Sequence, residues 1–267
     1  SGTTPLEVVA TLHRRIDAAL AGVDTLDPSG DVELRRTLED IRCMAYLGRY
    51  YAHKIAAATE LALLRETLDA DHRDNVAREL NLSAHYWRLY TSSAVALYSN
   101  PLWTNRVGHV DWRENYQSVL YDLTTTGSKI DIPSIEPTPG GVILEAEDAE
   151  SDLPMETEIP GFTGTGYLDL RRAEGTRPIE WSFDAPRSGT FILEFRYSQR
   201  WGGNHMSAGL EINGDPVDPL IMWPSGTPET WVWDRATVQL EAGNNTIRLT
   251  PSAAPRIDHL NILDTGY

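Results

Sequence analysis

Apolar residues recur every three or four positions through the first half of the chain, which is the spacing of helix faces. The four helices predicted from this spacing span 4–20, 31–68, 72–99 and 111–123, and Asp111 is the predicted N-cap of the last one. Thr4-Pro5 supplies an N-cap and a first-turn proline for the first helix. The helix over 31–68 carries two apolar stripes side by side. A helix with two apolar faces needs more than one neighbour, so these segments predict a helical bundle.

The second half of the chain has a different pattern, in which apolar and polar residues alternate over short runs. Alternation is typical of strands with one buried face, and turn signals such as Asn213-Gly214 separate the runs. The predicted strands span 142–146, 167–170, 179–183, 189–197, 208–212, 232–240, 245–250 and 257–263. Strands without intervening helices predict an antiparallel β-sandwich of the jelly-roll type.

These two patterns predict a multidomain α and β protein. The helical bundle is expected over 1–127 and the β-sandwich over 142–267. Between them, residues 128–141 are rich in proline and glycine, with Pro133, Pro137 and Pro139 in a short stretch. That composition is typical of a linker.

The net charge of the chain limits the classes of molecule that it is expected to bind. The chain has 39 acidic and 23 basic residues and a net charge of −16. A surface this negative repels phosphate groups, so we expect neither nucleic acid nor a membrane as partner. A neutral ligand is compatible with it, as is an acidic ligand held by a cation or an arginine. The single cysteine, Cys43, excludes an intrachain disulfide and lies in a helical run, where a buried thiol is expected.

Short sequence motifs in the β half appear in a characteristic order. They include Glu145-Ala146-Glu147, Gly161-Phe162-Thr163-Gly164-Thr165-Gly166-Tyr167-Leu168, Ile179-Glu180-Trp181-Ser182-Phe183, Phe195-Arg196-Tyr197, Leu240-Glu241-Ala242-Gly243-Asn244 and Ile257-Asp258-His259-Leu260. Together they resemble the family 35 carbohydrate-binding modules, close relatives of family 6. The resemblance implies a β-sandwich that binds a polysaccharide or oligosaccharide, of plant or microbial origin.

The resemblance also implies a structural Ca²⁺ near one edge of the sandwich, held by Glu145, Glu147 and Asp258. Glu145 and Glu147 lie two residues apart on a predicted strand and therefore share one face of it. Carboxylate oxygens are hard ligands that suit Ca²⁺ better than zinc. Without the resemblance, three solvated surface acids would explain the same residues.

Members of the family bind sugar at loops at one end of the sandwich. Aromatic side chains offer flat apolar faces to sugar rings, and polar groups fix the hydroxyls. The predicted ligand-binding residues are Tyr167, Trp201, Asn204, His205, Trp223, Trp231 and Arg256. Trp181 is expected to be structural, and Trp233 stays open between the two roles.

Arg256 stands where many members of the family carry an asparagine that bonds a sugar hydroxyl. A guanidinium suits a carboxylate, so a ligand that contains uronic acid is the hypothesis. A surface arginine that replaces the binding function is the alternative.

The helical half is loosely similar to the region that follows the catalytic domain in large bacterial glycoside hydrolases. That similarity implies an upstream catalytic domain as partner and an extracellular, secreted or periplasmic location. The chain has no His-Glu-x-x-His, nucleophile-elbow or phosphate-loop motif, so we expect no catalytic residues and no enzyme activity from it alone.

Two alternatives stay open at this point. In the first, the helical half completes the active site of the parent glycoside hydrolase. In the second, the fragment is structural and binds no sugar, and its helices form a homodimer through their extra apolar face.

Overall fold

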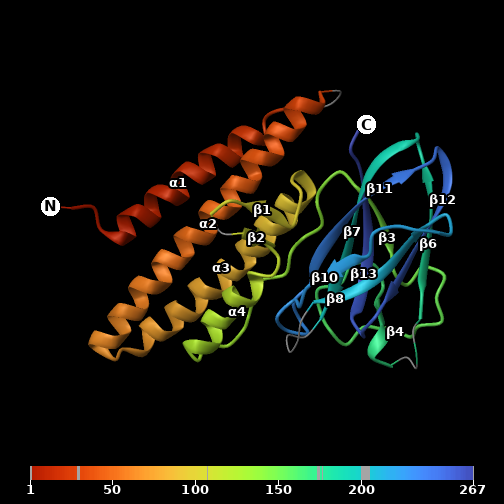
Figure 1. The fold of residues 1–267 in the computed structure, drawn as a ribbon. Helices are drawn as coiled ribbons and strands as arrows, with labels where there is room; N and C mark the ends of the chain where they lie inside the picture. The colour runs from red at the N-terminus through yellow and green to blue at the C-terminus, as the bar shows by residue number, and fades with distance from the viewer. Residues whose placement is uncertain are drawn as a thin grey trace. The chain divides into compact units, whose positions relative to one another are not determined.

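A computed structural model describes residues 2–28, 31–106, 108–172, 175, 177–199 and 205–266. The chain divides into two compact units, Ser1–Pro133 and Ser134–Tyr267 (Figure 1). The first unit is built from helices, and the second is built from antiparallel strands. The predicted fold class, an all-α region followed by a β-sandwich, is therefore confirmed.

Among the described residues, the helical unit contains two long helices and two shorter ones. They are α1 (Pro5–Val23), α2 (Val32–Thr67), α3 (Ala70–Leu97) and α4 (Tyr116–Thr125). Thr4 is the N-cap of α1, as Thr4-Pro5 predicted, and the structure adds a capping box with Glu7. Cys43 on α2 is 2% exposed, and burial raises the pKa of its thiol to about 12. The expected burial of this thiol is confirmed, and a raised thiol pKa disfavours the reactive thiolate.

The end of the helical unit differs from the prediction. A short hairpin, β1 (Leu102–Thr104) and β2 (Gly108–Val110), precedes α4, which begins at Tyr116 and not near Asp111. The Asp111 carboxylate instead accepts hydrogen bonds from Asn100 Nδ2 at 2.7 Å and from Arg113 N at 2.9 Å. Aspartate bonds local backbone groups in a turn as readily as at an N-cap, which is why the sequence misplaced this helix start.

The described part of the second unit forms two antiparallel sheets. One has the order β10-β8-β12-β6, with β9 paired to β8. The other has the order β11-β7-β13-β5-β4, with β3 paired to β13. The strands are β3 (Val142–Glu145), β4 (Met155–Glu156), β5 (Tyr167–Asp169), β6 (Ile179–Ala185), β7 (Gly189–Ser198), β8 (Met206–Ile212), β9 (Asp215–Pro216), β10 (Leu220–Met222), β11 (Val232–Leu240), β12 (Gly243–Pro251) and β13 (Arg256–Asp264).

Buried side chains follow the alternation that the sequence predicted in some strands and depart from it in others. In β6, the alternate residues Ile179, Trp181 and Phe183 are buried. The central parts of β7 and β13 are buried on both faces. A strand with a second covered face can hold polar side chains away from water, and the site described below is built there.

Residues 134–141, which belong to the predicted linker, lie against the sandwich. Ile135 is 3% exposed and donates its backbone N–H to Trp231 O at 2.7 Å. Thr138 Oγ1 donates to Glu194 Oε1 on β7 at 2.5 Å, and Asn261 Nδ2 on β13 donates to Thr138 O at 3.0 Å. This segment therefore covers part of the outer faces of β7 and β13.

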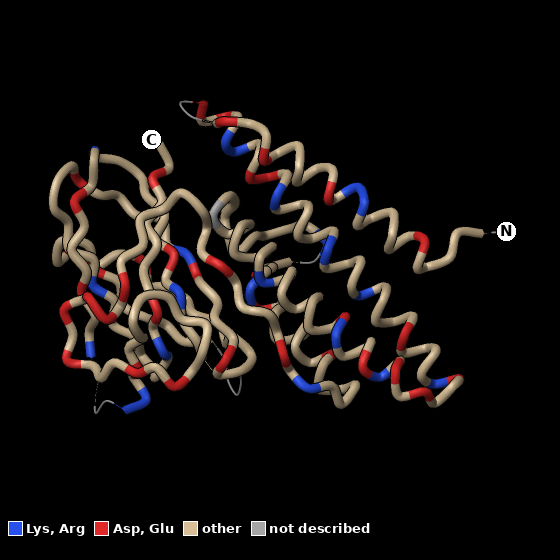
Figure 2. The backbone as a smooth tube through the Cα atoms, turned by 180° about the vertical axis from the view of Figure 1, so that it is seen from behind, with Lys and Arg blue, Asp and Glu red and all other residues tan. Residues whose placement is uncertain are grey.

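Acidic and basic side chains are interspersed along the helices, and acidic side chains are spread over the sandwich (Figure 2). Within the described part of the chain, no helix is both long enough and apolar enough to cross a bilayer.

Candidate functional site

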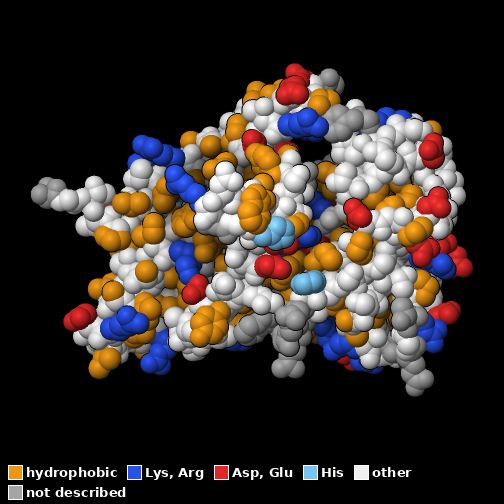
Figure 3. Space-filling model, in the orientation of Figure 1, with side chains coloured by type: hydrophobic (Ala, Val, Ile, Leu, Met, Phe, Trp, Pro, Cys, Tyr) orange, Lys and Arg blue, Asp and Glu red, His pale blue; other side chains and the backbone are white. Residues whose placement is uncertain are grey.

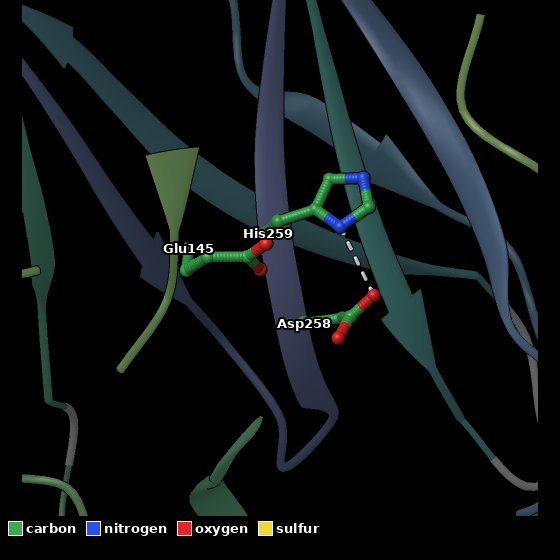
Figure 4. Close-up of side chains that lie close together, drawn as sticks. All are labelled: Glu145, Asp258 and His259. Carbon is green, nitrogen blue, oxygen red and sulfur yellow. Dashed lines mark ion pairs between the residues drawn. The ribbon is translucent and has the colours of Figure 1, made fainter. Parts of the chain in front are cut away.

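Two carboxylates from distant parts of the sequence meet where β3 pairs with β13. Glu145 ends β3 and lies directly opposite His259 of β13 in the antiparallel register. Asp258 precedes His259, and Ala146 N donates to Asp258 O at 2.9 Å. One ligand atom from each of Glu145, Asp258 and His259 lies within 4.8 Å of the other two (Figure 4). The strand pairing alone thus creates a cluster of potential metal ligands.

The loop over residues 163–166 closes over these carboxylates. Thr163 donates from Oγ1 to Glu145 Oε2 at 2.8 Å and from its backbone N to Asp258 Oδ1 at 2.9 Å. The backbone N–H groups of Thr165 and Gly166 both donate to Glu147 Oε1, at 2.5 and 3.1 Å. All three predicted acids are therefore joined through one short loop.

Gly164 is required at the centre of this loop. Its φ is +62°, a left-handed conformation that favours glycine. A Cβ at this position would lie 2.3 Å from Glu147 Oε1 and 2.9 Å from Glu145 Cδ. The two carboxylates thus flank a backbone position that leaves no room for a side chain.

A buried arginine balances part of the negative charge. Arg196 on β7 donates from Nη1 to Asp258 Oδ2 at 2.5 Å and to Gly161 O at 2.9 Å. His259 Nδ1 lies 3.0 Å from Asp258 Oδ2 and 2.7 Å from Thr163 Oγ1. Burial raises the pKa of Glu145, and the neighbouring Asp258 and Glu147 act in the same direction. The hydrogen bond from Thr163 and the proximity of His259 oppose this shift.

Three of the predicted ligand-binding aromatic residues, Tyr167, Trp223 and Trp231, are buried inside the sandwich. Tyr167 and Trp231 are each 0% exposed, and their ring centroids lie 5.3 Å apart. Trp231 Nε1 donates to Pro160 O at 2.8 Å, and Arg196 Cζ lies 5.6 Å from the centroid of the indole. A Cβ on Gly161 would lie only 3.2 Å from Cδ1 of this indole, so the loop before β5 packs closely against it.

Trp223 is also buried, at 2% exposure, and its backbone joins an internal polar cluster. Trp223 N donates to Asp234 Oδ2 at 3.0 Å, and Tyr197 Oη donates to Trp223 O at 2.5 Å. The expectation that Tyr167, Trp223 and Trp231 present exposed faces is therefore wrong. Trp181 and Trp233 are buried as well, at 3% each, which agrees with the structural role predicted for Trp181.

The remaining predicted ligand residues occupy different environments. His205 is exposed, and its ring centroid lies 4.9 Å from that of Trp223. Trp201 and Asn204 lie outside the described residues. Arg256 is 4% exposed, with Nε 3.6 Å from Asp169 Oδ2, so it is not the open surface arginine of the alternative reading.

The guanidinium of Arg256 is poorly satisfied. Its closest hydrogen bond, from Nη1 to Pro228 O, is 3.5 Å long, and its buried Nε has no hydrogen-bond partner among the described residues. Burial and the neighbouring Arg171 lower the pKa of Arg256. Arg171 itself is 45% exposed and donates from Nε to both Asp169 oxygens, at 2.9 and 3.1 Å. Two guanidinium groups therefore share one carboxylate.

Comparisons with known proteins show which proteins the β half of the chain is similar to. No protein-family model matches the chain. Endo-1,4-beta-xylanase B of Cellvibrio japonicus is 31% identical over 117 residues, which are 42% of this chain and 19% of the xylanase. A solved family 35 carbohydrate binding module from Clostridium thermocellum is 32% identical, with a TM-score of 0.43, over 46% of this chain and 97% of that module. The C-terminal half resembles the family 35 carbohydrate-binding modules.

The matches to longer enzymes are confined to a small part of those enzymes. Cycloisomaltooligosaccharide glucanotransferase of Niallia circulans is 30% identical over 111 residues, which are 41% of this chain and 11% of that enzyme. The chain thus spans less than a fifth of the length of either relative. In the family 35-like half, the predicted sandwich is present, and the similarity of the helical half to other hydrolases stays a prediction.

The carboxylate cluster of this family 35-like sandwich suits an oxygen-liganded cation. Glu147 Oε2 is buried and has no hydrogen-bond partner in the described part of the chain. Glu145, Glu147 and Asp258 carry three formal negative charges, which Arg196 only partly offsets. Carboxylate oxygens in excess of the available positive charge are the ligand set of a hard divalent ion such as Ca²⁺.

Sequence reasoning missed three residues of this cluster, namely Thr163, Arg196 and His259. Their strands and loops were recognised, but no role was assigned to them. A signal was present for Arg196, because a charged residue stands between Phe195 and Tyr197 in a strand that is apolar on both sides. In a strand buried on both faces, such a residue must have a buried partner.

Proposed function

We propose that the sandwich binds a polysaccharide and serves as an accessory region of a secreted glycoside hydrolase. The observation that carries this proposal is the 31% identity to a segment that makes up 19% of a xylanase. The matching segment is only a small part of that enzyme, which fits a substrate-binding role better than a catalytic one. Binding to a polymer would raise the local concentration of an attached catalytic domain on its substrate.

Calcium has a structural role in this proposal. Glu145, Glu147 and Asp258 would hold the ion, and its charge would offset the negative charge that Arg196 leaves unbalanced. The three ligands come from β3, from the residues just after it and from β13. Bound calcium would therefore join the opening and closing strands of the sandwich and stabilise the loop over 163–166.

The proposed ligand is a saccharide that carries a carboxylate, such as a uronic acid. Support comes from Arg256, whose guanidinium is poorly hydrogen-bonded, and from Arg171, which is 45% exposed beside it. An incoming carboxylate would share these guanidinium groups with Asp169. Among the described residues, His205 is a further predicted contact and is exposed to an incoming ligand. Buried Tyr167 lies near both Arg171 and Arg256, and in this proposal it would help to hold the two arginine side chains in position.

A glycan array and titration calorimetry with neutral and uronic-acid oligosaccharides test this function. We expect binding of uronic-acid oligosaccharides, and a loss of about tenfold or more in affinity for Arg171→Ala or Arg256→Ala, in line with the loss of a charge-assisted hydrogen bond. Arg248→Ala is the matched control, because Arg248 is also 45% exposed and pairs with Glu180 on the other sheet. Absence of binding to all saccharides, with and without calcium, would contradict the proposed function.

If both arginine variants bind the saccharide with unchanged affinity, the site at Arg171 and Arg256 is refuted. The saccharide would then bind elsewhere on the sandwich. Completion of an upstream active site by the helices and homodimer formation through them stay predictions.

A further inference from the structure

Helix α1 is attached to the helical unit by few buried side chains. Of its 19 residues, Ile16 and Val23 are buried. A groove of about 400 Å³ runs along its seam with α2 and is lined by Ile16, Met44 and other side chains of both helices. Apolar side chains lie exposed among charged ones over the helices (Figure 3). Because Val9, Leu12 and Leu20 are only half-buried, polar contacts contribute to the attachment of α1 as well.

Those polar contacts come from two arginines of α2. Arg42 Nη2 donates to Asp24 Oδ1, just after α1, at 3.3 Å. Arg49 donates to Asp17 and also contacts Nδ1 of His13. Near this point the two helices are close together, because a Cβ on Gly48 would lie 2.9 Å from Ile16 Cδ1. Arg49 thus lies at the centre of the seam.

The contact between Arg49 and His13 determines the charge of the histidine. A guanidinium has only hydrogen-bond donors, so Nδ1 of His13 must be the acceptor. An accepting Nδ1 carries no proton, and the imidazole is therefore neutral. Protonation would place an N–H and a positive charge directly against the guanidinium.

The other charged and titratable groups around His13 do not remove this conflict. From α2, the ring centroid of His53 lies 5.0 Å from that of His13. From α3, Glu79 Oε2 lies 2.7 Å from His53 Nδ1, so that carboxylate is already engaged with another histidine. Tyr86, also on α3, stacks against His53 at 5.4 Å and lies 5.9 Å from Arg49 Cζ. From α1 itself, Asp17 is 63% exposed and pairs with Arg49.

The direction of the pKa shift agrees with this geometry. Burial lowers the pKa of His13, and the positive Arg49 and the neighbouring His53 lower it further. Asp17 and Glu79 act in the opposite direction with smaller effect. Because the attached state binds the proton less well than a released α1, acid shifts the equilibrium toward release.

We infer that α1 is an acid-releasable helix, with His13 as the group whose protonation breaks its contact with Arg49. Attachment is strongest above the ordinary histidine pKa of about 6.5 and weakens as the pH falls below it. Release uncovers the face of α2 that contains Gly48 and Ala45. An isolated helix of this length is only marginally stable in water, so a released α1 also loses helical hydrogen bonds. The exposed surface of the helical unit would then depend on the pH of its surroundings.

Hydrogen–deuterium exchange of the whole 267-residue chain tests this inference. Exchange of residues 5–23 is measured at pH 7.5 and pH 5.5, after correction for the intrinsic effect of pH on exchange. We expect the protection of α1 to fall at the lower pH by up to roughly tenfold per pH unit, the limit for one proton. Protection of α3 should fall less than that of α1, since no hydrogen bond or ring contact joins α3 to His13 itself within the described residues.

His13→Asn supplies the decisive variant, because its amide oxygen can accept from Arg49 and never takes up a proton. We expect this variant to keep α1 protected at both pH values, while His13→Lys exposes α1 at both. His109→Asn is the control, since His109 is exposed on the hairpin strand β2, and it should behave like the natural chain. Constant protection of α1 in the natural chain, or an unchanged pH dependence in His13→Asn, would overturn the inference.

Discussion

Arg196 Nη1 and Asp258 Oδ2 lie 2.5 Å apart, and the two side chains are 2% and 0% exposed. Arg196 comes from the middle of β7 and Asp258 from the third position of β13, strands that pair with each other in one sheet. The pair is therefore an internal link between the sheet and the carboxylate cluster. It also brings Trp231 into contact with the same guanidinium, since Arg196 Cζ lies 5.6 Å from the centroid of its ring.

Replacing Arg196 with methionine should destabilise the sandwich severely. Removal of one partner of a buried ion pair leaves an uncompensated charge and costs about 3–5 kcal/mol. Chemical denaturation followed by tryptophan fluorescence measures this loss. Arg248→Met is the control, because Arg248 is 45% exposed and its loss should change stability little. A small effect of Arg196→Met would show that Asp258 does not depend on this arginine.

Chelation should lower the melting temperature of the sandwich, and added calcium should restore it. A ligand that binds only the folded state stabilises it, by about 2.7 kcal/mol at a hundredfold excess over its dissociation constant. Differential scanning calorimetry with a chelator and with calcium measures the difference. Glu147→Gln should abolish it, whereas Asp218→Asn, a change on an exposed loop, should retain it. Identical melting curves in chelator and calcium would contradict the proposed metal site.

Glu145→Gln should have opposite effects with and without calcium. Burial raises the pKa of Glu145, so its contribution to stability is present at pH values below its ordinary pKa and is lost as the pH rises through the raised value. At neutral pH without metal, the ionised carboxylate is thus unfavourable, and the neutral glutamine should raise the melting temperature. With calcium the same variant lacks a ligand and should melt below the natural chain. Equal shifts of the same sign in both conditions would refute this account.

Alanine substitutions at two glycines distinguish the cost of backbone strain from the cost of crowding the carboxylates. Gly164 and Gly214 both have positive φ, +62° and +85°. A Cβ at Gly164 would collide with Glu147 Oε1, whereas nothing lies within 4 Å of a Cβ at Gly214. We expect Gly214→Ala to cost about 1 kcal/mol from strain alone, and Gly164→Ala to cost clearly more. Gly164→Ala should also weaken stabilisation by calcium, which the melting curves measure. Equal costs at the two positions would show that the carboxylates can move aside.

The fragment 134–267 should be more stable than the fragment 142–267. The shorter fragment lacks Ile135, which is 3% exposed, and the hydrogen bond from Thr138 to buried Glu194. Loss of one buried aliphatic side chain and of such a hydrogen bond costs about 2–4 kcal/mol in total. Thermal unfolding of the two fragments measures the difference. Equal stability would favour a linker that extends to residue 141, as the proline-rich sequence suggests.

Several elements and buried residues could be predicted from the local residue pattern alone. Ile179, Trp181 and Phe183 alternate with polar residues, and this local property placed β6 and its inward face. Cys43 in a helical run was expected to be buried for the same kind of reason. The start of α4 was misplaced because Asp111 can cap a helix or close a turn, and only its contacts with Asn100 and Arg113 distinguish the two.

Exposure of the indoles could not be judged from local pattern. Trp223 and Trp231 stand beside glycine- and proline-containing segments, which usually lie at the surface. Their burial depends on contacts with residues far away in sequence, such as Pro160 with Trp231 Nε1 and Asp234 with Trp223 N. Neither contact can be predicted from the residues next to the tryptophan in the sequence.

The order of apolar and polar residues determined by itself that this protein has a helical half followed by strands, because periodicity is a property of neighbours along the chain. The resemblance of the sequence to a family also predicts that Glu145, Glu147 and Asp258 hold one metal ion. Tertiary structure alone decided that Arg196 pairs with Asp258, that Gly164 lies between Glu145 and Glu147, and that Arg49 contacts His13. Each of these contacts joins segments remote in sequence, and their geometry depends on strand register and helix packing.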